Sequence, residues 1–219
     1  MSDPPHVARL ARLVGFYGIV GDEGPLPPVE WARALHAGGA CAIQLRFKRS
    51  TPRDSLALAR AVRAALPEGL LIVDDRPDLA LLAGADGVHV GEADLSPADA
   101  RRVVGPSLLV GATVRNGREA RLAVAAGADH LGAGPVFPSR TKPLDLPALG
   151  VAGLSAVCRA VAAPVVAISG IDERNIGSVA RAGAACAAAI GAVGQSPDPV
   201  GATRKLASAF AAGRLEARW

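Results

Sequence analysis

Eight short apolar segments recur along this chain, each followed by glycine or polar residues and separated from the next by a segment with helical periodicity. Each is a continuous run of β-favouring residues rather than an alternating one, which is typical of strands covered on both faces. We predict strands at residues 16–20, 41–45, 70–73, 87–90, 108–112, 131–133, 165–168 and 186–189. The connections carry helix start and stop signals, among them Thr51-Pro52, Ser96-Pro97 and Gly38-Gly39.

Strands and helices that alternate at a spacing of roughly 20–30 residues indicate a parallel α/β architecture. Eight such units close into a barrel more readily than they form an open sheet. A doubly wound sheet is the competing fold, but GxGxxG is absent from the first strand–helix turn. We therefore predict an α/β fold of the (β/α)8 TIM barrel type. It is expected to form one domain over residues 1–219, with an N-terminal extension at 1–15 and a C-terminal tail at about 213–219.

The composition suits a barrel with an aliphatic core, because half of the residues are hydrophobic and only 3% are aromatic. The formal net charge of +4 is mildly basic, but aromatic and basic residues do not interleave. We therefore expect small anionic substrates and no nucleic-acid partner. Cys41, Cys158 and Cys186 form no CxxC pair, which argues against a disulfide framework and a zinc site.

No signal-peptide pattern and no apolar run of membrane-spanning length occurs in the sequence. A cytoplasmic protein without membrane contact is therefore expected. The sequence leaves open whether the chain forms a homo-oligomer.

The active site of such a barrel is built from residues at the carboxyl ends of the strands. The unusual polar residues of this chain follow five successive predicted strands at that rim. They are Gln44, Arg46 and Lys48 after the second strand, Asp74, Asp75 and Arg76 after the third, Glu92 and Asp94 after the fourth, Thr113 and Arg115 after the fifth, and Ser139, Thr141 and Lys142 after the sixth. Agreement among five strands indicates one site rather than five ordinary solvated loops.

The sixth of these segments, LGAGPVFPSRTK at residues 131–142, shows the pattern most clearly. Gly134-Pro135 should end the strand, since glycine adopts conformations other residues avoid and proline cannot donate to a sheet. Two hydroxyls, a guanidinium and an ammonium follow, and such donors suit an anionic, phosphate-bearing ligand. Taken alone, the segment is explained equally well as a solvated loop.

Asp75 and Asp94 come from neighbouring strands, so their carboxylates can converge. Adjacent acids repel each other, and a hard divalent cation with oxygen ligands relieves the repulsion. Mg²⁺ needs only one or two carboxylates, because water and substrate phosphates complete its octahedron. The alternative is structural: Asp75 pairs with Arg76, and Asp94 caps a turn.

Arg46, Lys48 and Lys142 around such a metal would bind a diphosphate. The ends of the seventh and eighth strands, Ser169-Gly170 and Gly191-Ala192, occupy the place where barrels commonly bind a phosphate through backbone N–H groups. One cationic, metal-bearing pocket and one backbone phosphate site imply two phosphorylated ligands. Their joining, with diphosphate as leaving group, is the reaction that this arrangement indicates.

The histidines offer no obvious catalytic partner. His89 lies within the fourth predicted strand, and we interpret it as a hydrogen-bonded core residue in preference to a catalytic base. His6, His36 and His130 are interpreted as structural or surface residues.

Five segments of the chain resemble the thiamine-phosphate synthase (thiamine-phosphate pyrophosphorylase) family. They are QLRFK at 44–48, VDDRPDLA at 73–80, GVHVGEADL at 87–95, LGAGPVFPSRTK at 131–142 and PVVAISGI at 164–171. The matches occur in the family's order from about Tyr17 to Val193. The resemblance implies an enzyme that joins hydroxymethylpyrimidine diphosphate to hydroxyethylthiazole phosphate and releases diphosphate. The family's mechanism is dissociative: diphosphate leaves, and the thiazole nitrogen attacks the pyrimidine carbocation.

By the family's pattern, each candidate residue acquires a role. Arg46, Lys48 and Lys142 would be catalytic, and with Gln44 they would hold the pyrimidine diphosphate. Asp75 and Asp94 would ligate Mg²⁺. The other substrate-binding positions would be Asp74, Thr113, Ser139, Thr141, Gly170, Gly191 and Ala192.

Several positions depart from the family's pattern. The departures are Asp74 for Asn, Glu92 for Gln, Thr113 for Ser, Arg115 for His, Ser139 for Thr, Ser169 for Gly and Gly191 for Ser. They leave two alternatives open, a paralogue resembling thiazole tautomerase and a non-catalytic protein that binds thiamine intermediates. The tautomerase alternative calls for a histidine after the sixth strand, where this chain has Pro135.

Overall fold

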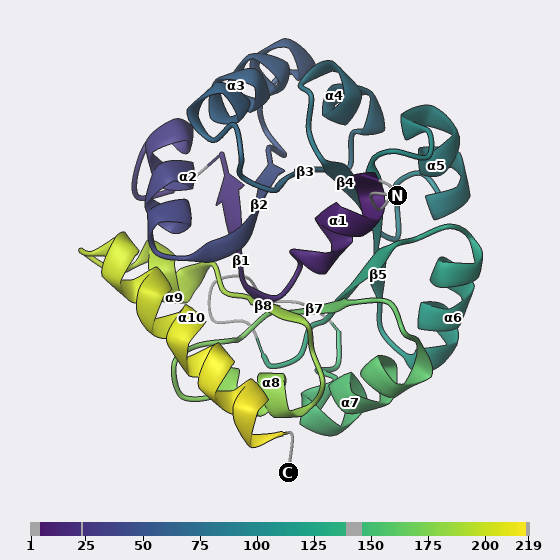
Figure 1. Cartoon of the computed structure of the whole chain (residues 1–219), viewed down its shortest axis with the longest axis vertical. Helices are drawn as coiled ribbons and strands as arrows, with labels where there is room; N and C mark the ends of the chain where they lie inside the picture. The colour runs from purple at the N-terminus through teal and green to yellow at the C-terminus, as the bar shows by residue number, and fades with distance from the viewer. Residues whose placement is uncertain (1–4, 23, 139–145, 218–219) are drawn as a thin grey trace.

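Eight parallel strands form a closed barrel in the computed structural model, which describes residues 5–22, 24–138 and 146–217 (Figure 1). Each strand pairs with the next, and β8 pairs with β1 to close the ring. The strands are β1 (Gly15–Gly21), β2 (Ala40–Arg46), β3 (Leu71–Asp74), β4 (Gly87–Val90), β5 (Leu109–Val114), β6 (His130–Ala133), β7 (Val165–Ile168) and β8 (Cys186–Ala188). The predicted (β/α)8 TIM barrel is therefore confirmed.

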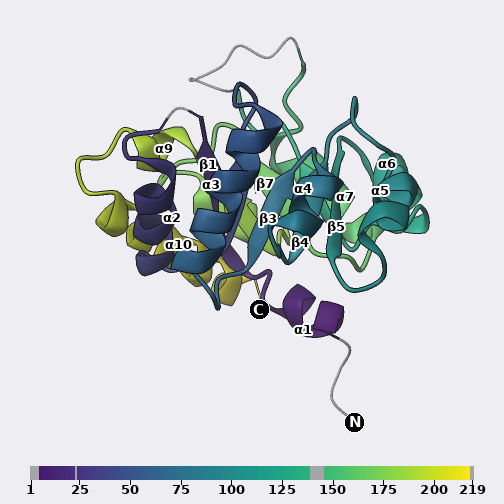
Figure 2. The same cartoon turned by 90° about the horizontal axis from the view of Figure 1, so that it is seen from above.

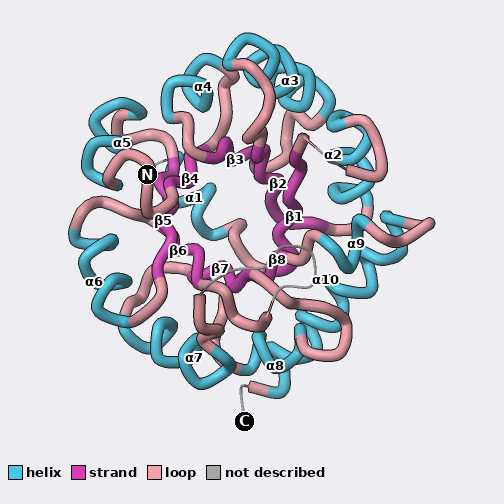
Figure 3. Tube along the Cα trace, turned by 180° about the vertical axis from the view of Figure 1, so that it is seen from behind, coloured by secondary structure: helices cyan, strands magenta, loops and turns pink. Residues whose placement is uncertain are grey.

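The helices surround the strands as an outer ring, except the first, which lies inside that ring in this view because it covers one end of the barrel (Figure 3). They are α1 (Pro5–Ala11), α2 (Pro28–Ala37), α3 (Pro52–Ala65), α4 (Pro77–Leu82), α5 (Pro97–Val104), α6 (Gly117–Ala125), α7 (Gly150–Ala160), α8 (Ile176–Arg181), α9 (Gly191–Gly194) and α10 (Pro199–Glu216). Several begin with proline, which is pre-organised for the first helical turn. Thr51 and Ser96 cap α3 and α5 by accepting a hydrogen bond from a backbone N–H.

Several element boundaries differ from the sequence-based expectation, among them the ends of β5 and α10. Strand β5 continues through Thr113 and Val114, two β-branched residues that favour strands, so Thr113 lies in the strand rather than after it. Helix α10 continues to Glu216, so the expected tail from about residue 213 is wrong. Within this last part, Gly213 packs tightly on α8, where an added Cβ would lie 2.6 Å from the Gly177 carbonyl oxygen. The short helices α1 and α9 were not expected.

The core has two layers. Inside the barrel, apolar side chains from alternate strand positions meet, among them Tyr17, Ile19, Ile72 and Val166. A larger cluster fills the space between the outer faces of the strands and the helices. Both strand faces are thus covered, which is why the strands are continuous apolar runs.

Helix α1 lies across the amino-terminal end of the barrel (Figure 2). Arg9 holds it there by pairing with Asp86 at 2.9 Å and donating to the Ser107 carbonyl at 2.7 Å. The opposite end, where the strands end, is left for the site. None of the helices in the described ranges is long and apolar enough to cross a membrane.

Candidate active site

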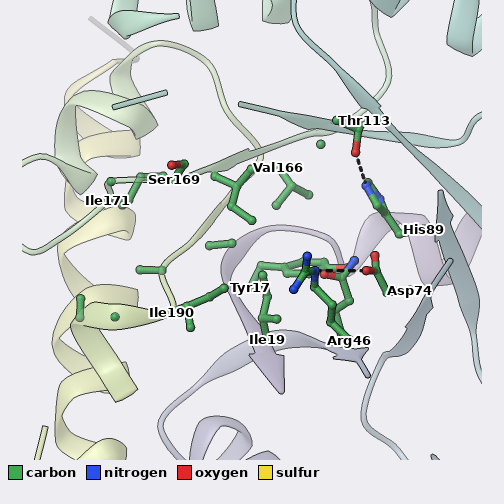
Figure 4. A pocket seen from close by; sticks show the side chains of 18 of the residues that line it. Tyr17, Ile19, Arg46, Asp74, His89, Thr113, Val166, Ser169, Ile171 and Ile190 are labelled. Atoms are coloured by element: carbon green, nitrogen blue, oxygen red, sulfur yellow. Dashed lines mark hydrogen bonds and ion pairs between the residues drawn. The ribbon is translucent and has the colours of Figure 1, made fainter. Parts of the chain in front are cut away.

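A cavity of about 580 Å³ opens at the carboxyl ends of the strands (Figure 4). All the positions to which the sequence analysis assigns a catalytic, substrate-binding or metal-binding role, and which the structure describes, line it. They are Gln44, Arg46, Lys48, Asp74, Asp75, Asp94, Thr113, Gly170, Gly191 and Ala192. Residues 100 or more positions apart in the sequence therefore share one pocket, as the rim pattern predicts.

On one side of the pocket, two cations and two acids form a cluster. Lys48 donates to the Asp75 carboxylate and lies 3.7 Å from Asp74 Oδ2, and Arg46 Nε lies 3.4 Å from the same Asp74 oxygen. Burial, together with the charge of Asp75, raises the pKa of Asp74 to about 7, although Lys48 and Arg46 act in the opposite direction. This side of the pocket is dense in charge and holds two partly exposed cationic side chains that an anionic ligand can draw away from the acids.

Asp75 and Asp94 meet in this cluster, and each carboxyl group is close enough to shift the pKa of the other. Burial, followed by the contact with Asp75, raises the pKa of Asp94. Burial also acts to raise the pKa of Asp75, but the contacts with Lys48, Asp94 and Asp74 together outweigh it and lower that pKa. Asp75 also has a left-handed backbone (φ 63°), a strained conformation of the kind found at functional sites. Asp94 accepts from the Gly91 N–H at 2.8 Å, so it also closes a turn.

The two carboxylates fit a magnesium ion. Two acids crowded enough to share a proton are the donor set that a hard divalent cation relieves. Within the described ranges, no cluster of three or more His, Cys, Asp and Glu side chains could hold a metal. A site with two protein ligands suits Mg²⁺, which takes its other ligands from water and phosphate.

The opposite side of the pocket is formed by the loops after β7 and β8. Ser169 and Gly170 both have left-handed backbones, with φ of 82° and 67°. An added Cβ at Gly170 would lie 2.6 Å from Phe137 Cβ, so only glycine fits there. Ser169 occupies a position that suits glycine, and its hydroxyl donates to the Phe137 carbonyl at 3.3 Å.

Some candidate residues take other places. Ser139, Thr141 and Lys142 lie outside the described residues. Three further rim residues do not line the pocket: Arg76 pairs with Asp78 at 2.5 Å, and Arg115 pairs with Glu92 at 2.9 Å. The suggested Asp75–Arg76 pair is thus replaced by Asp75–Lys48.

The sequence-based interpretation missed five polar residues of the pocket wall: Tyr17, His89, Asp172, Arg174 and Gln195. Tyr17 and His89 both line the cavity, and His89 Nε2 lies 3.1 Å from Thr113 Oγ1 (Figure 4). Burial of the ring lowers the pKa of His89 to about 4, so the ring is neutral at neutral pH. The alternation of side chains along the first strand could have indicated Tyr17, since Tyr17 and Ile19 share one strand face and both point into the barrel.

Behind His89 lies a second buried histidine, His130, whose ring centre is 5.7 Å away. His130 is fully buried, and neither of its ring nitrogens has a hydrogen-bond partner among the described residues. Burial and the neighbouring His89 lower its pKa to about 3. Gly111 makes room for the pair, since an added Cβ there would collide with His130 Nε2 and would lie 2.5 Å from His89 Nδ1.

Replacing His130 should make the protein more resistant to acid. The unfolded chain takes up a proton on this histidine as the pH falls through about 6.5, whereas the folded chain does not until about pH 3. Stability is therefore lost as the pH falls below 6.5, by about 2 kcal/mol at pH 5 from this residue. Between pH 7 and pH 5, His130→Leu should lose about 2 kcal/mol less unfolding free energy in urea than the wild type. An equal loss in both proteins would contradict the depressed pKa, and the exposed His36→Leu serves as control.

The fold and the pocket define a class: a barrel enzyme whose site at the carboxyl ends of the strands is suited to phosphorylated ligands and a divalent cation. The family model described as "Thiamine monophosphate synthase" matches residues 16–193. The chain belongs to this family.

Individual relatives agree with the family match. The chain is 53% identical to a thiamine-phosphate synthase of Anaeromyxobacter dehalogenans, over 94% of this chain and 92% of the relative. It is 47% identical to one of Myxococcus xanthus, over 97% of each. A solved structure of thiamine phosphate pyrophosphorylase from Pyrococcus furiosus superposes with a TM-score of 0.85 at 36% identity, over 94% of this chain and 98% of that one. The 3-hexulose-6-phosphate synthase of Salmonella typhimurium, at 16% identity and a TM-score of 0.69, shows the shared fold alone.

Proposed function

We propose that this family member is a thiamine-phosphate synthase. It joins hydroxymethylpyrimidine diphosphate to hydroxyethylthiazole phosphate and gives thiamine phosphate and diphosphate, so it is a transferase. The observation that carries the proposal is one pocket with two unlike sides. Arg46, Lys48, Asp75 and Asp94 line one side, and the loops at Gly170 and Gly191 line the other.

The diphosphate of the pyrimidine substrate belongs on the charged side. Arg46 and Lys48 contact acidic side chains there, and each cation is 42% exposed in its side chain, so both can turn to phosphate oxygens. Their charges stabilise the diphosphate as its bond to the pyrimidine methylene breaks. Lys142, in the segment outside the described residues, is proposed to assist them.

Asp75 and Asp94 are the residues that would hold Mg²⁺. A bound Mg²⁺ neutralises charge that develops on the leaving diphosphate. The shared pocket position of Asp75 and Asp94 and the raised pKa of Asp94, to which Asp75 contributes, support this assignment, because both report two acids held close together.

The thiazole phosphate belongs on the opposite side. Backbone N–H groups at Gly170, Gly191 and Ala192 are proposed to bind it, with hydroxyls of Ser139 and Thr141 from the segment outside the described residues. The thiazole nitrogen is thereby held facing the pyrimidine carbon that loses diphosphate. The reaction then needs no protein nucleophile, only leaving-group stabilisation and alignment of the two substrates.

The floor between the two sides is where the heterocycles are proposed to lie. Gln44 and Tyr17 line it, and both side chains are almost fully buried. The Tyr17 hydroxyl has no hydrogen-bond partner among the described residues, so a ligand atom can take that place. Thr113 and the neutral His89 add two further hydrogen-bonding groups on the same floor.

Replacing Asp74 by asparagine should strengthen binding of the pyrimidine diphosphate. Asp74 puts an acid beside Arg46 and Lys48, where the family carries an uncharged amide. In Asp74→Asn both cations are freed for phosphate, and we expect the KM for the pyrimidine diphosphate to fall about fivefold, equivalent to about 1 kcal/mol. Steady-state kinetics with each substrate varied in turn measures this, and the KM for the thiazole phosphate should stay within twofold. A rise in KM for the diphosphate would mean that Asp74 is needed to hold the cations in place.

Reconstitution tests the proposed function. Purified protein, Mg²⁺ and both phosphorylated heterocycles should yield thiamine phosphate and diphosphate in equal amounts. Turnover of a thiazole substrate to a tautomer without coupling would favour the tautomerase alternative, and binding without any turnover would favour the non-catalytic one.

We also propose a reducing cytoplasmic compartment, supported by free thiols at Cys41, Cys158 and Cys186.

A further inference from the structure

We propose that Asp22 and Asn175 are positioning residues, each of which fixes one of the two loops that meet the substrates. Asp22 acts on the loop after β2, which carries Lys48, and Asn175 acts on the loop after β7, which contains Gly170. Neither residue lines the pocket, so each acts through the loop that it holds. The inference rests on the proposed function, because it assigns the two loops to different substrates.

Asp22 follows β1 directly and holds three consecutive residues of the next loop. Its Oδ2 accepts from the N–H groups of Lys48 at 2.6 Å and Arg49 at 2.9 Å. Its Oδ1 accepts from the N–H of Ser50 at 3.2 Å and from the Ser50 hydroxyl at 2.6 Å. Burial alone would raise the pKa of Asp22, but these hydrogen bonds outweigh it and lower the pKa, so the carboxylate stays ionised.

Lys48 is held both at its backbone and at the end of its side chain. Its backbone N–H is fixed by Asp22, while its ammonium group donates to Asp75 and lies 3.7 Å from Asp74. A lysine has a long, flexible side chain, so its reach is defined only when its backbone is held. The Asp22 carboxylate thus sets where the Lys48 charge can meet the diphosphate.

Asn175 holds the opposite loop by both ends of its amide. Its Nδ2 donates to the Gly170 carbonyl at 2.8 Å, and its Oδ1 accepts from the Asp172 N–H at 2.9 Å. These bonds span a loop whose residues Ser169 and Gly170 have left-handed backbones. A strained backbone persists only where its surroundings fix it, and Asn175 supplies that constraint. The direction of the Gly170 N–H, proposed to meet the thiazole phosphate, depends on it.

The proposal predicts that each of two variants raises the KM for a different substrate. Asp22→Asn keeps the size of the side chain but removes one strong acceptor, and it should raise the KM for the pyrimidine diphosphate at least tenfold. Asn175→Ala should raise the KM for the thiazole phosphate at least tenfold. Each variant should leave the other KM within about threefold, since displacement of one loop by about 1 Å affects only the ligand it contacts. A general structural role would move both values in both variants, and that result would overturn the proposal.

Two matched variants control for local destabilisation. Thr51→Ala removes the α3 cap immediately after the Asp22-held loop, where Thr51 accepts from the Asp54 N–H at 3.2 Å. Asn116→Ala removes the α6 cap, an asparagine that accepts from the Glu119 N–H at 2.9 Å. Both changes cost stability through a helix cap but touch neither substrate loop. Both KM values should therefore stay within twofold of wild type, and a tenfold change in either control would count against the proposal.

The route through Lys48 is tested by a double variant. In a Lys48→Ala background, Asp22→Asn should change kcat/KM less than twofold, because the group it positions is gone. An undiminished effect would mean that Asp22 acts by another route. Thermal unfolding confirms that each variant is folded before its kinetics are compared.

Calorimetry with inorganic diphosphate separates the inference from the proposed function. With Mg²⁺ present, Asp22→Asn should weaken diphosphate binding at least tenfold, and Asn175→Ala should leave it within twofold. If the wild type binds diphosphate but forms no thiamine phosphate, the proposed function is wrong while the role of Asp22 is still measured. If the wild type is active and Asp22→Asn binds diphosphate normally, the inference is wrong while the function stands.

Discussion

Lys48→Ala should lower kcat/KM for thiamine phosphate formation by about 100- to 1,000-fold, the range typical of losing a group that stabilises a developing charge. Lys48 is the cation that reaches both acids of the charged side, Asp74 and Asp75. Its loss removes a positive charge from beside the leaving diphosphate, leaves Asp75 without its cationic partner and leaves Asp74 with Arg46 alone. Initial rates with both substrates at and below saturation measure the effect, which should appear in kcat as well as in KM.

The exposed Lys205 of α10 provides the matched control for this change. Lys205→Ala removes the same charge far from the pocket and should leave kcat/KM within twofold. If Lys48→Ala retained more than a tenth of the wild-type kcat/KM, diphosphate departure would not depend on this side of the pocket.

Asp94→Asn should reduce activity at least 100-fold and weaken the dependence on Mg²⁺. The amide keeps an oxygen that can accept from the Gly91 N–H, so the turn that Asp94 closes can persist. It loses the charge and the basicity that a hard cation requires of its ligand. A titration of rate against Mg²⁺ concentration measures the change, and the half-saturating concentration should rise at least tenfold.

Asp99 of α5 offers a control with similar chemistry. Its backbone N–H donates to the hydroxyl of Ser96, which caps the helix, and its carboxylate is exposed. Asp99→Asn should leave the magnesium titration unchanged. Chelation of Mg²⁺ should abolish wild-type activity and be reversed by added Mg²⁺. Full activity of Asp94→Asn at the same Mg²⁺ concentration would remove Asp94 from the metal site.

The fold could be predicted from the sequence because two signals identify each strand, a continuous apolar run and a polar or glycine-rich segment at its end. The segments at 87–90 and 165–168 are predicted without error, since Asp86 and Pro164 precede them and Gly91 and Ser169 follow. Ends without such a mark were less certain, as at Thr113 and Val114, where two strand-favouring residues extend β5 past the expected boundary.

The site was predictable in part, for a related reason. Charged residues such as Lys48 and Asp94 are unusual after an apolar strand, so the sequence alone places them at the rim. Tyr17 and His89 carry no such mark, because a polar residue inside a strand can face either the barrel interior or the helices. The contacts of Asp22 were also hidden, since they join the ends of two strands through backbone N–H groups that any sequence would supply.

A crystal structure of the protein with thiamine phosphate, diphosphate and Mg²⁺ tests the central claim most directly. We expect diphosphate against Arg46 and Lys48, Mg²⁺ between Asp75 and Asp94, and the product phosphate at the backbone of Gly170 and Gly191. Two phosphorylated groups on opposite sides of one pocket would show that the two substrates meet there. A diphosphate and a product phosphate that share one side, or a product bound outside this pocket, would contradict the account.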